Sequence, residues 1–169
     1  MVMLPEKLPG KQLGLSDIKN GKVIVTRNKP RLEYAWDAGM AIGRYLEELK
    51  NGRLIGKKCN KCGRIMIPPR MFCELCFRPS DEWVYLKDTG RVNTYSVCYV
   101  NWDASRVEEP FLPAVIEIDG ASEGMGIMHL LGEVKPDEIK IGMAVQAVWK
   151  PAGEREGAIT DIRYFKPMV

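Results

Sequence analysis

Residues 59–76 of the chain read CNKCGRIMIPPRMFCELC, in which two Cys-x-x-Cys pairs are separated by ten residues. Two residues between paired cysteines allow one tight turn to direct both sulfurs toward a single ion, and Gly63 lets the backbone close behind the first pair. Two such turns together supply the four thiolates of a tetrahedral, closed metal site. The stretch therefore predicts a metal centre with four ligands, which are Cys59, Cys62, Cys73 and Cys76.

Zinc is the metal that this pattern favours. Iron in a rubredoxin-like centre uses the same four sulfurs, so electron transfer through bound iron stays an alternative, which the colour of the purified protein would reveal. The roughly 25 residues around the cysteines lack a sizeable core of their own, so the metal is expected to stabilise the fold. Four thiolates also leave no open coordination position of the kind that a catalytic zinc needs.

The rest of the chain is organised around this centre. It has 169 residues, of which 46% are hydrophobic and 28% charged, a composition typical of a globular protein with one domain or two small ones. We expect an N-terminal extension over residues 1–30 with one short strand at 22–26, a helical segment over 31–52, a zinc ribbon over 53–79 and a β-barrel over 80–169.

The helical segment is predicted from its apolar spacing. Large apolar side chains recur at helical intervals from Arg31 to Lys50, directly after Pro30, which suits the first position of a helix. The sequence Asp37-Ala38-Gly39 could divide this stretch into two helices. Two of its aromatic residues, Trp36 and Tyr45, either cap the domain's own core or face a partner, since aromatic side chains are enriched at the centres of interfaces.

After Pro79 the pattern changes to short β-like runs separated by turn residues. Five or six runs at this spacing predict a small closed barrel or a sandwich. The runs lie at residues 83–86, 92–100, 113–118, 126–134, 143–149 and 159–165. The fold class that follows is mostly β with N-terminal helices.

Catalysis has little support in the sequence. The chain contains one histidine, His129, so a histidine-based triad would have to be built around it alone. The fifth cysteine, Cys98, lies in an apolar run and is expected to be a buried core residue rather than a nucleophile. We therefore expect a protein that is not an enzyme. The N-terminal residues lack the apolar stretch of a signal peptide, and no run approaches the ~20 residues of a membrane span, so we expect a cytoplasmic protein without membrane contact.

Opposite charges gather in different parts of the chain. The formal net charge is only +3, which is too balanced for a protein whose main task is to neutralise phosphate backbones. Residues 50–78, however, carry eight basic side chains and one acidic one, whereas residues 103–138 carry nine acidic and two basic ones. A basic metal module is thus followed by an acidic stretch of the barrel.

The order of these parts resembles a prokaryotic zinc-ribbon plus OB-fold family, long known as a domain of unknown function. The resemblance covers about residues 31–167 and is most specific where the spaced cysteines enclose Pro68-Pro69-Arg70. Further matching stretches are Leu49–Leu54, Gly90–Val97, Pro113–Ile118, Ile141–Val145 and Tyr164–Pro167. The resemblance implies a rubredoxin-like zinc ribbon followed by a small OB-fold barrel.

Members of that family accompany thiolases and other acyl-CoA enzymes. The resemblance therefore implies a non-catalytic accessory subunit that binds acyl-CoA, or helps to form the CoA site of a thiolase-like or HMG-CoA synthase-like partner, in lipid, isoprenoid or polyketide metabolism. Basic side chains of the ribbon could contact the phosphates of CoA, although each could equally serve only solubility. These candidates are Lys57, Lys58, Lys61, Arg64 and Arg70.

A second function remains open, because zinc ribbons and OB-folds both occur in proteins that bind single-stranded nucleic acid. Such proteins stack bases on exposed aromatic rings along a basic groove, and Tyr95, Tyr99 and Trp102 are possible stacking platforms. The acidic stretch that follows them would repel a phosphate chain. Nucleic acid is therefore the less favoured partner.

Overall fold

The computed structural model describes residues 13–26 and 31–168. The chain divides into two compact units, residues 1–36 and residues 37–169. In the described part of the first unit, a single helical turn, α1 (Leu15–Lys19), is followed by irregular chain. The strand predicted at 22–26 is therefore wrong; a strand needs a neighbour to pair its backbone, and the described residues of this unit offer no such ladder.

The second unit opens with helix α2 (Gly39–Lys50), which is shorter than the predicted helical segment. Residues 31–38 are not helical, because Gly39 has a φ of +68°, a left-handed conformation that stops the helix from extending backward. The Asp37 carboxylate accepts a hydrogen bond from the Gly39 N–H at 3.0 Å and fixes this turn. From Gly39 onward, α2 turns Ala41, Tyr45 and Leu49 into the core.

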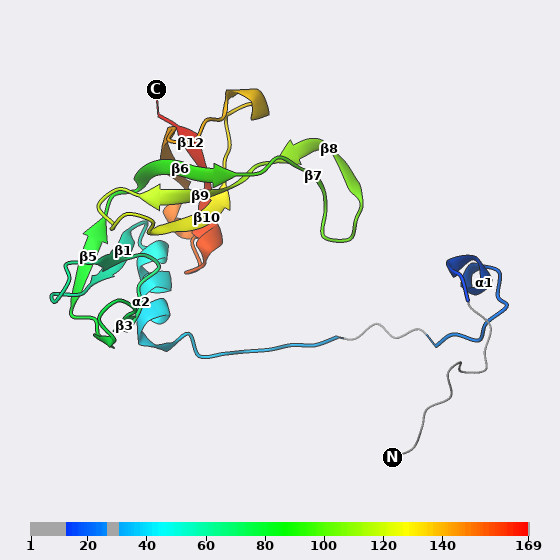
Figure 1. Cartoon of the computed structure of the whole chain (residues 1–169), viewed down its shortest axis with the longest axis horizontal. Coiled ribbons are helices and arrows are strands. Elements are labelled where there is room, and N and C mark those ends of the chain that lie inside the picture. The colour runs from blue at the N-terminus through cyan, green and yellow to red at the C-terminus, as the bar shows by residue number, and fades with distance from the viewer. Residues whose placement is uncertain (1–12, 27–30, 169) are drawn as a thin grey trace, which may run out of the picture. The chain divides into compact units, whose positions relative to one another are not determined.

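The ribbon consists of a three-stranded antiparallel sheet and a small two-stranded ladder (Figure 1). In the sheet, β1 lies between β2 and β5. At Gly56 the backbones of β1 and β2 approach closely, since a Cβ added to this residue would lie 2.8 Å from the carbonyl oxygen of Met66. The strands are β1 (Leu54–Lys58), β2 (Ile65–Met66) and β5 (Glu82–Leu86) in the sheet, and β3 (Phe72–Cys73) and β4 (Arg78–Pro79) in the ladder.

The remaining strands build the OB-fold, a five-stranded antiparallel sheet in the order β10-β9-β6-β11-β12. Its two edges meet at one parallel bridge, Leu131 to Phe165, so the sheet curls into a partly open barrel rather than the fully closed one predicted. The strands are β6 (Thr89–Tyr95), β9 (Pro113–Ile118), β10 (Gly126–Leu130), β11 (Ala144–Trp149) and β12 (Ile162–Pro167). Three short 3-10 helices, η1 (Pro136–Glu138), η2 (Ala152–Glu154) and η3 (Ile159–Asp161), connect them.

A two-stranded arm interrupts the barrel between β6 and β9. It is formed by β7 (Cys98–Val100) and β8 (Arg106–Phe111), and we call residues 96–112 the hairpin arm (Figure 1). The sequence predicted one continuous strand over 92–100 and none at 106–111. Cys98 lies in the arm and is only half-buried, so its prediction as a buried core residue is wrong.

Ribbon and barrel share one hydrophobic core. At their boundary the Ile65 N–H donates to the Ser122 Oγ at 2.8 Å, and the Ser122 N–H donates to the Ile65 carbonyl oxygen at 3.0 Å. The core continues from the ribbon into the barrel through the following buried residues: Tyr45, Leu49, Ile55, Met66, Val92, Ile116, Val145 and Phe165. The predicted fold class, mostly β with a zinc ribbon before an OB-fold, is thus confirmed. None of the helices within residues 13–26 and 31–168 is long and apolar enough to cross a membrane.

Candidate metal centre and surrounding surfaces

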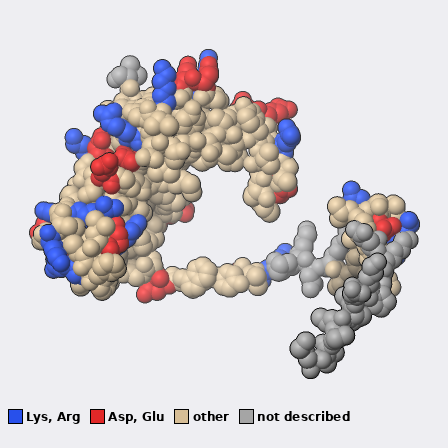
Figure 2. Space-filling view, in the orientation of Figure 1, with Lys and Arg blue, Asp and Glu red and all other residues tan. Residues whose placement is uncertain are grey.

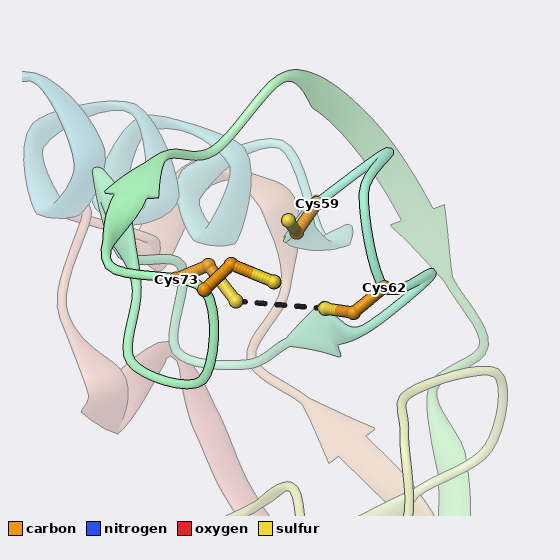
Figure 3. A group of neighbouring side chains, drawn as sticks. Cys59, Cys62 and Cys73 are labelled. Carbon is orange, nitrogen blue, oxygen red and sulfur yellow. Dashed lines mark hydrogen bonds between the residues drawn. The ribbon is translucent and has the colours of Figure 1, made fainter.

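The four predicted cysteines come together in the ribbon. Their sulfur atoms all lie within 4.8 Å of one another, and the Sγ atoms of Cys62 and Cys73 are 3.6 Å apart (Figure 3). A tetrahedral zinc ion with Zn–S bonds of about 2.3 Å separates its sulfurs by roughly 3.8 Å. The thiols therefore already stand near the spacing that one tetrahedral ion requires.

The two cysteine pairs sit on two turns of the same design. In the first, the Gly63 N–H donates to the Cys59 carbonyl oxygen at 2.7 Å; in the second, the Phe77 N–H donates to the Cys73 carbonyl oxygen at 2.9 Å. Gly63 has a φ of +77° and Phe77 a φ of +50°, so both residues take the left-handed conformation. The hydrogen bond that closes each turn joins residues close together in the chain, which explains why the spacing of the cysteines predicted the centre.

The pKa values of the thiols also suit a site that binds a cation. The backbone N–H of Cys62, helped by that of Lys61, stabilises the thiolate of Cys59 and lowers its pKa to about 7. Burial and the neighbouring sulfurs raise the pKa of Cys76 to about 12. Without a counter-charge the four groups cannot all ionise at neutral pH, whereas a divalent ion stabilises all four thiolates.

The centre is a structural zinc site. Cys59 and Cys73 are fully buried and belong to the same core as α2 and the barrel. Four sulfurs complete the coordination of one ion, so no position is left for a substrate or a reactive water. The ion's task is to hold together a ribbon whose strands are two to five residues long.

Lys57, one of the five candidates for phosphate contact, is buried instead. Its side chain is only 6% exposed, and its Nζ donates to the carbonyl oxygens of Ser80 at 3.3 Å and Asp81 at 3.1 Å. The ammonium also lies 4.8 Å from the centre of the Trp83 ring. Lys57 therefore joins strands of the ribbon and is not available to a ligand.

The other four candidates for phosphate contact differ in their exposure and in whether a carboxylate already pairs with them. Arg64 and Arg70 share the carboxylate of Glu74, at 2.8 Å and 3.7 Å. The backbone N–H of Glu74 and these two guanidinium groups hold the pKa of its carboxyl below the usual range. Lys58 is partly exposed and Lys61 exposed. The basic side chains of the ribbon appear as a blue group at the lower left of Figure 2.

The two aromatic candidates for a partner surface, Tyr45 and Trp36, differ in exposure. Tyr45 is 4% exposed and packs in the core, and its burial raises the pKa of its hydroxyl. Of the two alternatives, Tyr45 therefore follows the one in which it fills the domain's own core. Trp36 is 84% exposed, and its ring stacks on that of Tyr34 with the ring centres 5.5 Å apart.

His129 already has partners for both ring nitrogens. Its Nδ1 accepts a hydrogen bond from the Leu130 N–H at 2.9 Å, so its Nε2 carries the proton and donates to the Ile159 carbonyl oxygen at 3.2 Å. The ring also packs edge-on against Phe165. These contacts give the side chain a structural role rather than that of a base.

The hairpin arm was missed as a surface by the sequence reasoning. Its turn carries Trp102, which is 98% exposed and was noted only as a possible stacking platform. Asn, Asp and Ser at alternate positions 101, 103 and 105 are typical of a turn, and this signal could have located it.

Known proteins share both domains. A family model described as "ChsH2, rubredoxin-like zinc ribbon domain" matches residues 46–82, and one described as "ChsH2, C-terminal OB-fold domain" matches residues 83–150. A DUF35 domain-containing scaffold protein of Methanocaldococcus jannaschii is 36% identical over 118 residues, which are 68% of this chain and 82% of that protein.

Two further relatives show where such domains occur. A probable enoyl-CoA hydratase alpha subunit of Thermomonospora curvata is 30% identical over 108 residues, 64% of this chain but 33% of that protein. A solved structure named Ltp2-ChsH2(DUF35) aldolase contains a chain that is 26% identical with a TM-score of 0.55, and the match covers 82% of this chain and all of that one. With its zinc ribbon, its OB-fold and this degree of identity, the chain belongs to the DUF35 family of zinc-ribbon and OB-fold proteins.

Proposed function

We propose that this protein is a non-catalytic scaffold subunit that holds a thiolase-like or other acyl-CoA enzyme in the cytoplasm and contributes to that enzyme's CoA site. The observation that carries the proposal is the match to a relative named as a scaffold protein over 82% of that relative's length. Two other relatives carry the names of an enoyl-CoA hydratase subunit and an aldolase, which are the kinds of enzyme such a scaffold would serve.

The chemistry of the chain supports a helper rather than a catalyst. The metal site is saturated by four thiolates, and both nitrogens of His129 are engaged. Large apolar side chains meanwhile stand in solvent at Leu32, Tyr34 and Trp36. We expect these side chains to form a surface for another protein, since exposed apolar patches serve that purpose.

CoA carries phosphates, and the ribbon offers cations that could meet them. Because Lys57 is buried, the proposal rests on Lys58, Lys61 and Arg70. Arg64 is less available, since it forms the shorter ion pair with Glu74. Paired with a phosphate, each exposed lysine or arginine would form a charge-assisted hydrogen bond. We expect these contacts to complete a site whose greater part belongs to the enzyme.

The test is co-purification of the tagged chain from its native source, with the captured proteins identified by mass spectrometry. The proposal predicts a stoichiometric acyl-CoA enzyme and, by calorimetry, tighter CoA binding to the complex than to either protein alone. A Lys58→Glu/Lys61→Glu variant should keep the enzyme but weaken CoA binding, while Lys87→Glu, an exposed lysine at the end of β5, serves as the matched control. A chain that captures no acyl-CoA enzyme and binds no CoA would refute the proposal.

Single-stranded nucleic acid remains the second candidate, because Tyr99 and Trp102 are exposed next to an OB-fold. Against it stand Asp103, Glu108 and Glu109, which place three carboxylates on the same arm as these rings. Filter binding at increasing salt decides between the two. Micromolar or tighter affinity that falls steeply with salt would favour nucleic acid over the scaffold.

A further inference from the structure

The hairpin arm ends in an apolar tip. Trp102 is almost fully exposed, and the side chains of Tyr99 and Val100 are about half exposed. The arm projects from the end of the barrel, away from the body of the domain (Figures 1 and 2). Tryptophan and tyrosine are among the residue types enriched where a few side chains carry most of the binding energy of an interface.

The tip is also held rigid. The Asn101 N–H donates to the Ser105 carbonyl oxygen at 2.8 Å, and the Asp103 carboxylate accepts from both the N–H and the hydroxyl of Ser105, at 3.0 Å and 2.6 Å. Ala104 takes a left-handed φ of +65°, a conformation that costs energy for a residue with a side chain. A turn that is ordered before binding loses little entropy on docking.

A groove that matches this tip lies on the barrel. It has a volume of about 510 Å³, within the range of sites that hold a small molecule or a large side chain. Met128 on its wall is 73% exposed, and Leu130 and Ile159 are also open to solvent. The apolar residues that line the groove are Pro113, Met128, Leu130, Ile159 and Ile162.

The charges of arm and groove are opposite. Within residues 98–111 the arm carries Asp103, Glu108 and Glu109 against the single basic residue Arg106. The two charged residues among the groove's lining are both basic, Lys150 and Arg163. The tip is thus apolar with acidic flanks, whereas the groove, on another part of the same chain, is apolar with a basic rim, so the two surfaces are complementary.

The position of the two surfaces suits a reciprocal contact. Pro113, which lines the groove, directly follows the last residue of the arm. An arm that leaves the barrel beside a groove can enter the same groove of a second copy while receiving that copy's arm, as a two-fold symmetric interface requires. We infer that two copies of this chain exchange their arms, with Trp102 of each in the Met128 groove of the other. This inference does not rest on the proposed function.

The first test is the mass of the purified, zinc-loaded protein by light scattering over a range of concentrations. The expected mass is twice the 19.1 kDa of the chain. Trp102→Ser should yield the monomer, whereas the matched control Ile141→Ser, which removes another large apolar side chain that is 73% exposed, should stay dimeric. A monomeric wild type, or a dimer that Trp102→Ser does not disturb, would overturn the inference.

A charge exchange tests the geometry directly. Glu108→Lys/Glu109→Lys in the arm and Lys150→Glu/Arg163→Glu in the groove should each give monomers, since like charges then meet. Mixing the two variants should restore a dimer, because the basic arm of the first variant then meets the acidic groove of the second, and the acidic arm of the second meets the basic groove of the first. This recovery also proves that both variants are folded. If neither variant alone changes the mass, or the mixture stays monomeric, the arm does not bind this groove. A monomer that needs Trp102 to retain an enzyme partner would assign the arm to that enzyme and overturn the inference, while leaving the proposed function intact.

Discussion

Phe77 occupies in the second cysteine turn the backbone position that Gly63 occupies in the first. Each donates its N–H to the carbonyl oxygen of the first cysteine of its turn, and each has a positive φ. Glycine adopts this conformation freely, whereas a residue with a Cβ does so at a cost of about 1 kcal/mol or somewhat more. The phenyl ring offers little in return, since it is almost entirely in solvent.

Phe77→Gly should therefore leave the zinc-loaded protein as stable as the wild type or stabilise it by up to about 1 kcal/mol, because the relief of strain exceeds the extra entropy of glycine in the unfolded chain. Phe77→Ala keeps the Cβ and hence the strain, and serves as the control. The measurement is the free energy of unfolding in urea at saturating zinc. A loss of stability with glycine but not with alanine would contradict this account.

Removal of a zinc ligand should unfold the ribbon. Cys59→Ser is expected to lose the metal, measured as zinc per chain by mass spectrometry, and to become sensitive to protease between β1 and β5, because the binding energy of a structural zinc is folding energy. Cys98→Ser, in the arm, should retain one zinc per chain. The wild type should be colourless, and a visible absorption band would point to iron.

Lys57→Met should destabilise the protein by about 1–3 kcal/mol, since the carbonyl oxygens of Ser80 and Asp81 lose their donor in a buried place. Lys61→Met, at an exposed position of the same ribbon, should change the free energy of unfolding by less than about 0.5 kcal/mol. Urea unfolding of both variants decides the matter. Equal effects would mean that the buried ammonium is not bonded as described.

Asp161 should make the barrel sensitive to acid. The side chain is fully buried, which by itself would raise its pKa, but hydrogen bonds from the backbone N–H groups of Glu156, Ala158 and Gly157 outweigh burial and lower the pKa. A carboxyl whose pKa is lower in the folded state contributes stability at neutral pH. That contribution is lost as the pH falls from the unfolded pKa, near 3.8, through the lower folded value.

Asp161→Asn should thus cost about 2–4 kcal/mol at pH 7, because one amide oxygen cannot replace a charged acceptor of three N–H groups. It should also remove part of the loss of stability between pH 5 and pH 2. Asp137→Asn, an exposed aspartate in η1, is the control. If the unfolding free energy of Asp161→Asn follows pH as steeply as the wild type does, the carboxylate is not the group that titrates.

The sequence predicted the features that a regular spacing of residue types marks, and missed those that the conformation of a single turn decides. The cysteine turns are local, so spacing and Gly63 were sufficient. The possible break at Asp37-Ala38-Gly39 was noted, but helix was still expected before it, because the apolar spacing continues there; the structure has no helix over residues 31–38, since a left-handed backbone at Gly39 stops α2. The arm was missed because β7 and β8 form a two-stranded sheet of their own among the described residues and bury few side chains, so no regular apolar pattern marks them.

The burial of Lys57 follows from the alternation of side chains along a strand. Two consecutive residues of a strand point to opposite faces, so Lys57 and Lys58 could not both be exposed if one face of β1 was covered. Opposite Lys57 in the register stands Trp83, which receives the ammonium on its ring. Which of the two lysines is buried therefore depends on strand pairing, which a count of basic residues does not reveal.

The paired hydrogen bonds between Ile65 and Ser122 bear on how the chain is made. The four cysteines leave the ribosome before the barrel strands do, so zinc can order the ribbon while residue 122 is still being synthesised. The β2 strand then offers the nascent barrel a fixed backbone donor and acceptor at Ile65. We therefore expect metal supply during translation to affect how much of the barrel assembles correctly.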